Sequence, residues 1–409
     1  MKRWKFKPFE GKDVRKSTVP SPPRGPTNDT TKLESSLVSI LGIEDIKYDL
    51  RAFGGLMMPN LVPQIGSNPA LDTSISALLA LYRVRLYNYS KVDALTKYGQ
   101  ALRSMRETLN DPAQSIRVPL QTWVDRKNAE PHRQVVSHLF REAITQGKLS
   151  EIEPSYVYGL CQLAVYASWL NPNFQLGQWF WDACRTVDSP RPVRYHQGSF
   201  LCLEVGTMAE VTHYLSDPER YLAGLECVYR LFQVEKPQVR HLLALSTMSA
   251  LSPTATPMDT KVCASYRFAY TIMLGLGSIL NYFIRIFDSN PILLEESHHI
   301  IDESIWVAHE YSQLRPYGAT FVPDYLKMVW ASITDFHRST EIEAILIDYQ
   351  NDFEGAAYLE EALAIKQRLQ RTKKAYARPR AVQEPPSGTE LLDADATHHP
   401  SAMSECIVL

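Results

Sequence analysis

The segment Asn351-Asp352-Phe353-Glu354 is the part of this sequence that most resembles a catalytic motif. Terpene cyclases are helical enzymes that bind magnesium through an aspartate-rich motif and a second motif of Asn or Asp, Ser or Thr, and Glu. Gly355 and Leu359 stand where that second motif needs a hydroxyl and a carboxylate. The chain also has no Asp-Asp pair. We therefore expect no cyclase chemistry here.

Other reactive residue types also lack the spacing that chemistry needs. His298 and His299 are neighbours, so on a helix they point to different faces and cannot form an i,i+4 zinc pair. None of the six cysteines forms a CxxC pair. Glycine-rich phosphate loops, GxSxG and HExxH are missing as well. The sequence predicts a protein that is not an enzyme and that holds no metal or cofactor.

The last four residues, Cys406-Ile407-Val408-Leu409, fit a C-a-a-X pattern with leucine last, the type associated with geranylgeranylation. A single lipid anchors weakly and usually needs a second signal such as upstream basic residues. The pattern makes Cys406 a candidate lipidation site. It also keeps a membrane-associated protein open as an alternative.

A basic segment precedes the C-terminal tail. Its members are Lys366, Arg368, Arg371, Lys373, Lys374, Arg378 and Arg380. Such a cluster is typical of a nuclear localisation signal. Cations are also favoured at the C-terminal end of a helix, where they offset the helix dipole. The clustering continues beyond the expected helix end, which favours nuclear import.

The elements that would position these residues are helical. Between Val92 and Leu109, apolar residues recur at three- and four-residue steps and predict a buried stripe of Leu95, Tyr98, Leu102, Met105 and Leu109. A similar pattern predicts a helix over residues 71–87, and further helices are expected over 132–147 and 156–170. One last helix is expected to run through Phe353 and Leu359 to Leu369. Strand signals are scarce, so the sequence predicts an all-α protein.

Phe268 to Ile284 is the most apolar stretch. A membrane span needs about 20 apolar residues. This stretch is slightly short, contains Asn281, and lies among amphipathic helices. We therefore expect a central helix that is covered on every face, and no transmembrane segment.

The chain divides into three parts by composition. Residues 1–30 form a proline-rich basic arm that we expect to be disordered, and that either is solvated or contacts nucleic acid or an import receptor. Residues 31–374 are expected to form one large domain of packed antiparallel helices, and 375–409 a disordered tail. Over the whole chain, 43 Lys and Arg face 45 Asp and Glu, which does not indicate a polyanion-binding protein.

Two segments carry a family resemblance. One is Tyr98-Gly99-Gln100-Ala101-Leu102, and the other is Arg315-Pro316-Tyr317-Gly318-Ala319 with Trp330 and Ile345 to Asp352 downstream. Over about residues 35–370 the chain resembles the regulatory domain of fungal zinc binuclear-cluster transcription factors, the fungal-specific transcription factor domain. In the Arg-Pro-Tyr-Gly turn, Pro316 presets the backbone and Gly318 is expected to supply a positive φ.

The chain departs from this family in one important respect. The family's DNA-binding module holds two zinc ions with six closely spaced cysteines, and here no cysteine precedes Cys161. Direct DNA binding is therefore not carried over. Either the gene has lost the module, or an upstream in-frame exon encodes it.

The resemblance implies a nuclear protein that regulates transcription through its helical domain. Its expected partners are other transcription regulators or a second copy of itself, with room for a small-molecule effector. The alternative is a cytoplasmic helical scaffold, anchored to a membrane through Cys406.

Overall fold

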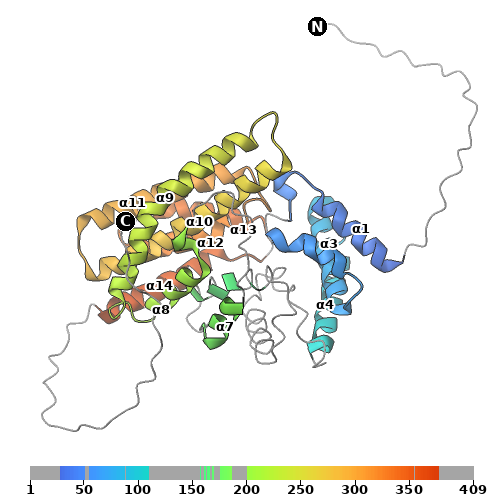
Figure 1. Cartoon of the computed structure of the whole chain (residues 1–409), viewed down its shortest axis with the longest axis horizontal. Coiled ribbons are helices and arrows are strands. Elements are labelled where there is room, and N and C mark those ends of the chain that lie inside the picture. Colours follow the sequence, from blue (N-terminus) through green and yellow to red (C-terminus); the bar gives the residue numbers. More distant parts are fainter. Residues whose placement is uncertain are drawn as a thin grey trace, which may run out of the picture.

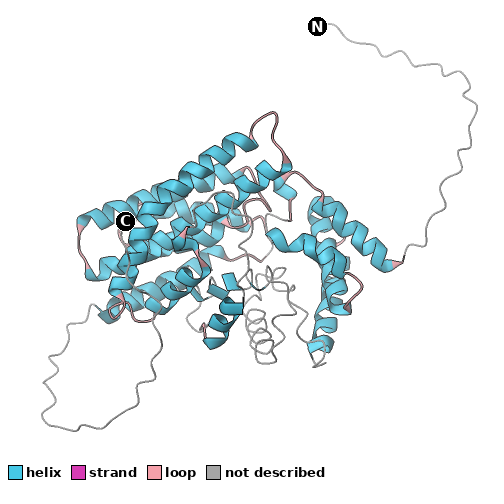
Figure 2. Cartoon of the chain, in the orientation of Figure 1, coloured by secondary structure: helices cyan, strands magenta, loops and turns pink. Residues whose placement is uncertain are grey.

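A computed structural model describes residues 28–50, 55–87, 89–109, 176–186, 200–353 and 355–376, together with single positions between 157 and 169. Every regular element in these ranges is a helix, which confirms the predicted all-α class (Figure 2). The expected arm, the tail with Cys406, and the helix predicted over 132–147 lie outside the described residues.

The larger block, which we call the C-terminal bundle, is built from six helices (Figure 1). They are α9 (Leu222–Ala250), α10 (Pro257–Phe287), α11 (Pro291–Ser312), α12 (Val322–Ser332), α13 (Ser339–Gln350) and α14 (Tyr358–Tyr376). Three shorter elements accompany it, namely α7 (Gln178–Thr186), the 3-10 turn η6 (Leu201–Leu203) and α8 (Val205–Tyr214).

Helix α10 is the centre of the bundle. It begins with a capping box in which Thr256 and Asp259 exchange hydrogen bonds, and Pro257 follows at the first helical position. All residues from Tyr270 to Ile284 are buried. By length and hydropathy alone α10 could cross a membrane, but 83% of its most apolar window is buried inside the protein. That burial agrees with the predicted core helix.

A largely buried carboxylate on α11, Glu303, contacts two neighbouring helices. Glu303 accepts hydrogen bonds from Tyr270 of α10 and from Lys236 of α9, whose Nζ lies 2.7 Å away. Arg240, also on α9, completes the group at 3.0 Å. Because a buried charge is costly without partners, these contacts fix how α9, α10 and α11 align.

The smaller block, which we call the N-terminal block, has its own apolar core. It contains α1 (Asp29–Leu41), the 3-10 turns η1 (Ile46–Tyr48) and η2 (Gly55–Gln64), α3 (Pro69–Tyr87) and α4 (Lys91–Leu109). Ile75, Leu79 and Tyr82 are buried on α3. Their spacing follows the apolar period that predicted a helix over residues 71–87. The blue helices in Figure 1 show how this block lies beside the bundle.

Helix α4 buries a different face from the predicted one. Leu95 is 64% exposed, whereas Ala94 and Ala101 are 1% and 0% exposed, and Met105 is buried as expected. Helix α4 packs along α3. Small side chains allow two helices to approach closely, so this contact selects the alanines over the larger Leu95.

The predicted single last helix is two helices. Helix α13 ends at Gln350, and α14 starts at Tyr358. Between them Gly355 has a φ of +81°, which stops helical geometry. The break turns α14 back so that it packs against α12 and α13.

Candidate functional site

The Arg-Pro-Tyr-Gly turn lies between α11 and α12 and joins the two blocks. The Tyr317 backbone N–H donates to the Lys47 carbonyl oxygen at 3.1 Å. The Tyr317 ring lies 5.3 Å from the ring of Tyr82 on α3. The Arg315–Pro316 peptide bond is cis. We call residues 315–318 the corner, because this turn of the bundle contacts the N-terminal block directly.

Gly318 performs a different role from the one predicted. Its φ is not positive, and the described glycines with positive φ are Gly66 and Gly355. A Cβ at position 318 would lie 2.7 Å from the carbonyl oxygens of both Ile46 and Leu314. Glycine is needed here because two backbone segments approach it, which local turn geometry could not indicate.

Arg315 anchors the other side of the corner. Its Nε and Nη2 donate to the two carboxylate oxygens of Asp352 at 2.7 and 3.0 Å. Its Nη1 also bonds Asp348, and its guanidinium lies 4.3 Å from the Tyr349 ring centre. The acidic residue that first suggested metal chemistry is therefore one half of a bidentate ion pair.

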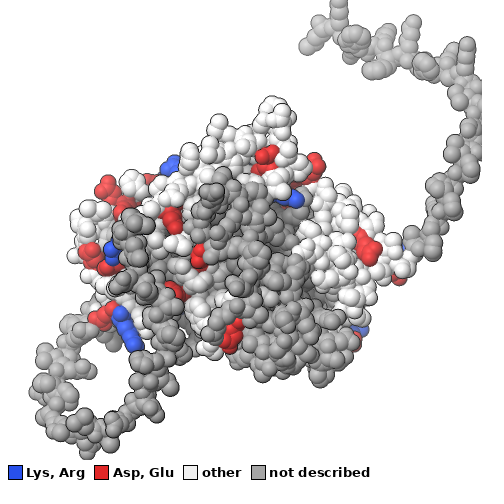
Figure 3. Space-filling view, viewed as in Figure 1, with Lys and Arg blue, Asp and Glu red and all other residues white. Residues whose placement is uncertain are grey.

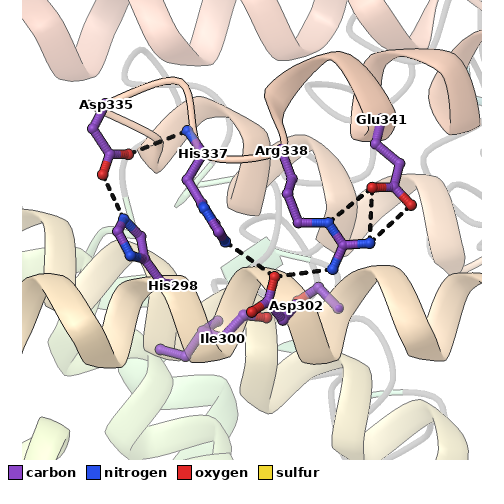
Figure 4. Close-up of polar contacts among 8 residues, drawn as sticks. His298, Ile300, Asp302, Asp335, His337, Arg338 and Glu341 are labelled. Atoms are coloured by element: carbon purple, nitrogen blue, oxygen red, sulfur yellow. Dashed lines mark hydrogen bonds and ion pairs between the residues drawn. The ribbon is translucent and has the colours of Figure 1, made fainter.

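The loop of residues 333–338 between α12 and α13 carries a second polar arrangement (Figure 4). His298 of α11 bonds Asp335 of the loop. Asp302 lies on α11 one turn after His298, and its Oδ1 is 3.0 Å from Nε2 of His337 in the loop. The two imidazole rings stack with their centres 4.2 Å apart. We call these residues, with Arg338 and Glu341, the histidine cluster.

Arg338 closes the histidine cluster at the start of α13. It donates to Asp302 at 2.9 Å and to both oxygens of Glu341 at 2.8 and 2.9 Å. Arg338 and Phe336 have φ values of 47° and 64°, a region that residues other than glycine seldom adopt. The paired charges hold this backbone, and Phe336 is left 82% exposed.

The carboxylates of the histidine cluster are held in their charged form. Partial burial raises the pKa of Asp302, but hydrogen bonds from Arg338 and His337 outweigh it and the net pKa is lowered. For Asp335, the bond from His298 likewise outweighs burial and lowers the pKa. Within the described residues no group of His, Cys, Asp and Glu is arranged to hold a metal ion. The cluster can bind protons and fix the loop.

Acid is expected to weaken the histidine cluster. A carboxylate with a lowered folded pKa stabilises the protein fully above its unfolded pKa of about 4, and this stabilisation is lost as pH falls through the folded value. The free energy of unfolding should therefore drop between about pH 5 and pH 3, and Asp302→Asn should make that drop shallower. Urea titrations at each pH measure the free energy of unfolding. As a control, 0.5 M NaCl should also make its dependence on pH shallower. If the free energy of unfolding fell equally steeply with pH in the wild type and in Asp302→Asn, the prediction would be contradicted.

The predicted basic segment is partly built into the fold. The Nζ of Lys366 lies 4.1 Å from the centre of the Trp330 ring, and burial lowers its pKa. Arg368 donates to the Trp169 carbonyl oxygen at 3.0 Å. Arg371, Lys373 and Lys374 are exposed, whereas Arg378 and Arg380 lie outside the described residues. The import signal stays a prediction that rests on the exposed members.

The sequence indicated the corner but missed the histidine cluster. The spacing of His298 and His299 excludes a zinc pair but indicates no other partner for His298. The available signal was the four-residue step from His298 to Asp302, which places both on one face of α11. Their partners lie more than thirty residues further along the chain, so spacing alone could not pair them.

The fold and these sites define an all-helical protein with two apolar cores joined at a polar corner. No protein-family model matches the chain, and no curated protein or solved structure matches it.

Proposed function

We propose that this chain regulates transcription in the nucleus through its helical domain, without a zinc cluster of its own. The proposal is supported by the corner. The corner belongs to the segment that carries the resemblance to fungal regulatory domains. Its Tyr317 and Gly318 contact the N-terminal block, and its Arg315 is bonded to Asp352 of the C-terminal bundle. A segment that connects two cores has a structural role, and proteins with the same two cores would be expected to share it. Other transcription regulators or a second copy would be the partners.

Direct DNA contact is not part of the proposal. On the described part of the face drawn in Figure 3, acidic and basic side chains are scattered and form no continuous basic surface. Nucleic-acid binding depends on clustered cations that neutralise phosphates. Regulation would therefore act through protein contacts.

Tethering tests this proposal. The full chain fused to a heterologous DNA-binding domain should change the output of a reporter gene by several-fold, and a fluorescent fusion should accumulate in the nucleus. The unfused DNA-binding domain is the control. A fusion that stays outside the nucleus and leaves the reporter unchanged would overturn the proposal.

The C-a-a-X pattern supports a second proposal, a cytoplasmic helical scaffold that is prenylated at Cys406. Membrane fractionation of the native protein beside Cys406→Ser separates the two. The scaffold requires the wild-type protein in the membrane fraction and the variant in the soluble fraction. Identical distributions would exclude the scaffold's anchor.

A further inference from the structure

A pocket of about 290 Å³ opens where α10 ends and α11 begins. Arg285 and Tyr282 of α10 line it, together with Lys373 from α14. Ile286, Pro291 and Leu294 supply an apolar wall. Its size is at the lower end of the range for small-molecule sites. Of these residues only Lys373 was described above, as a member of the basic segment.

Among the residues that the structure describes, no carboxylate is hydrogen-bonded to the guanidinium of Arg285. Its Nη1 bonds the Thr334 hydroxyl at 3.1 Å, and its Nη2 has two contacts of 3.5 Å, to Ser297 and to the Ser332 carbonyl. Its Nε is buried and has no hydrogen-bond partner in the described part of the chain. Burial lowers the pKa of this guanidinium. The nearby Asp335 attracts it but is bonded to His298.

Tyr282 lines the same pocket and also has a buried polar atom. The residue is 4% exposed, and its hydroxyl has no hydrogen-bond partner among the described residues. Burial raises its pKa to about 12, so it is a neutral donor near neutral pH. Buried polar atoms are normally paired, because an unpaired one costs about 1–3 kcal/mol. Two residues that line one pocket therefore each hold an enclosed donor that a polar ligand could satisfy.

We propose that this pocket binds a small monocarboxylic acid, with its carboxylate on Arg285 and its short apolar body against Ile286 and Leu294. Arg285 exchanges three neutral contacts for one charged pair, which is the stronger interaction. Because its Nε and the Tyr282 hydroxyl are enclosed, binding requires a small rotation of the arginine side chain.

The remaining charges select a single negative charge. Lys373 adds a second cation at the pocket, and Asp288 opposes it with one carboxylate. Asp288 accepts the Asn290 backbone N–H at 2.9 Å, which holds its side chain at the rim of the pocket. Two cations against one carboxylate suit a monoanion better than a phosphate dianion. The inference does not depend on the proposed nuclear role, because binding is measured on the purified full chain.

Calorimetry with 3-methylbutanoate, 3-methylbutanamide and inorganic phosphate tests the assignment. The carboxylate should bind the full chain with one site and a dissociation constant in the millimolar range or tighter. The amide, which has the same shape without the charge, should bind at least tenfold more weakly, and so should phosphate. No saturable binding of the carboxylate, or equal binding of amide or phosphate, would overturn the proposal.

Variants of the pocket residues test whether 3-methylbutanoate binds at this pocket. Arg285→Gln should weaken 3-methylbutanoate at least tenfold, and Tyr282→Phe should weaken it several-fold while thermal stability is kept, because the removed hydroxyl has no partner. Arg371→Gln, an exposed arginine of α14 outside the pocket, is the matched control and should bind like wild type. Thermal melts check that each variant is folded. Binding that Tyr282→Phe and Arg285→Gln leave unchanged, in folded protein, would overturn the proposal.

Discussion

Replacing Gly318 with alanine is expected to lower the free energy of unfolding by about 3 kcal/mol. The new methyl group would lie 2.7 Å from two backbone carbonyl oxygens, those of Ile46 and Leu314. Neither oxygen can rotate away, because each belongs to a main chain that its own block holds. The N-terminal block must therefore move away from the C-terminal bundle, and the Tyr317 contacts with Lys47 and Tyr82 would weaken with it.

The chain offers a matched control for this substitution. Gly99 lies within α4, and a Cβ there would meet no atom within 4 Å. Gly99→Ala should raise the free energy of unfolding by roughly 0.5–1 kcal/mol, because alanine loses less backbone entropy in a helix. Urea unfolding of both variants, followed by circular dichroism, measures the pair. A Gly318→Ala protein as stable as wild type would show that the corner does not set the distance between the blocks.

The second large effect is expected at Arg315. Arg315→Lys should lower the free energy of unfolding by about 2–3 kcal/mol, although it preserves the charge. Lysine lacks the planar fork that makes two parallel hydrogen bonds to the Asp352 carboxylate, and its ammonium cannot lie flat over the Tyr349 ring. The Arg315 and Asp352 side chains are only 19% and 15% exposed, so water would replace the lost bonds poorly.

A double-mutant cycle separates the pair from its surroundings. Arg315→Lys, Asp352→Asn and the double variant should show a coupling energy above about 1 kcal/mol. The pair of Arg230 and Glu226 on α9 is the control, with side chains 67% and 43% exposed and 3.8 Å apart. Its coupling should stay below about 0.5 kcal/mol, as for most surface ion pairs. Additive losses at Arg315 and Asp352 would mean that each residue acts separately.

The amino-acid sequence by itself determined the helical class and the central place of α10. A three- to four-residue apolar period allows burial only on a helix, and a segment apolar on every side must be covered on every side. Both are consequences of local pattern. The buried face of α3, with Ile75 and Tyr82, follows for the same reason.

Tertiary structure alone decided which face α4 buries and why the corner needs Gly318. An apolar period does not state whether the neighbouring helix will fit against Leu95 or against Ala94 and Ala101, since that depends on the shape of α3. The space available at Gly318 is set by the carbonyl of Ile46, far away in sequence.

The histidine cluster and the Arg285 pocket also needed the folded chain. Hydrogen bonds such as that between His337 and Asp302 join residues that are separated in sequence, and charge patterns do not encode which partners will meet. That the Arg285 Nε has no partner among the described residues is visible only in the folded chain. Local propensity chose the helices, and packing between distant segments chose the polar groups that face one another.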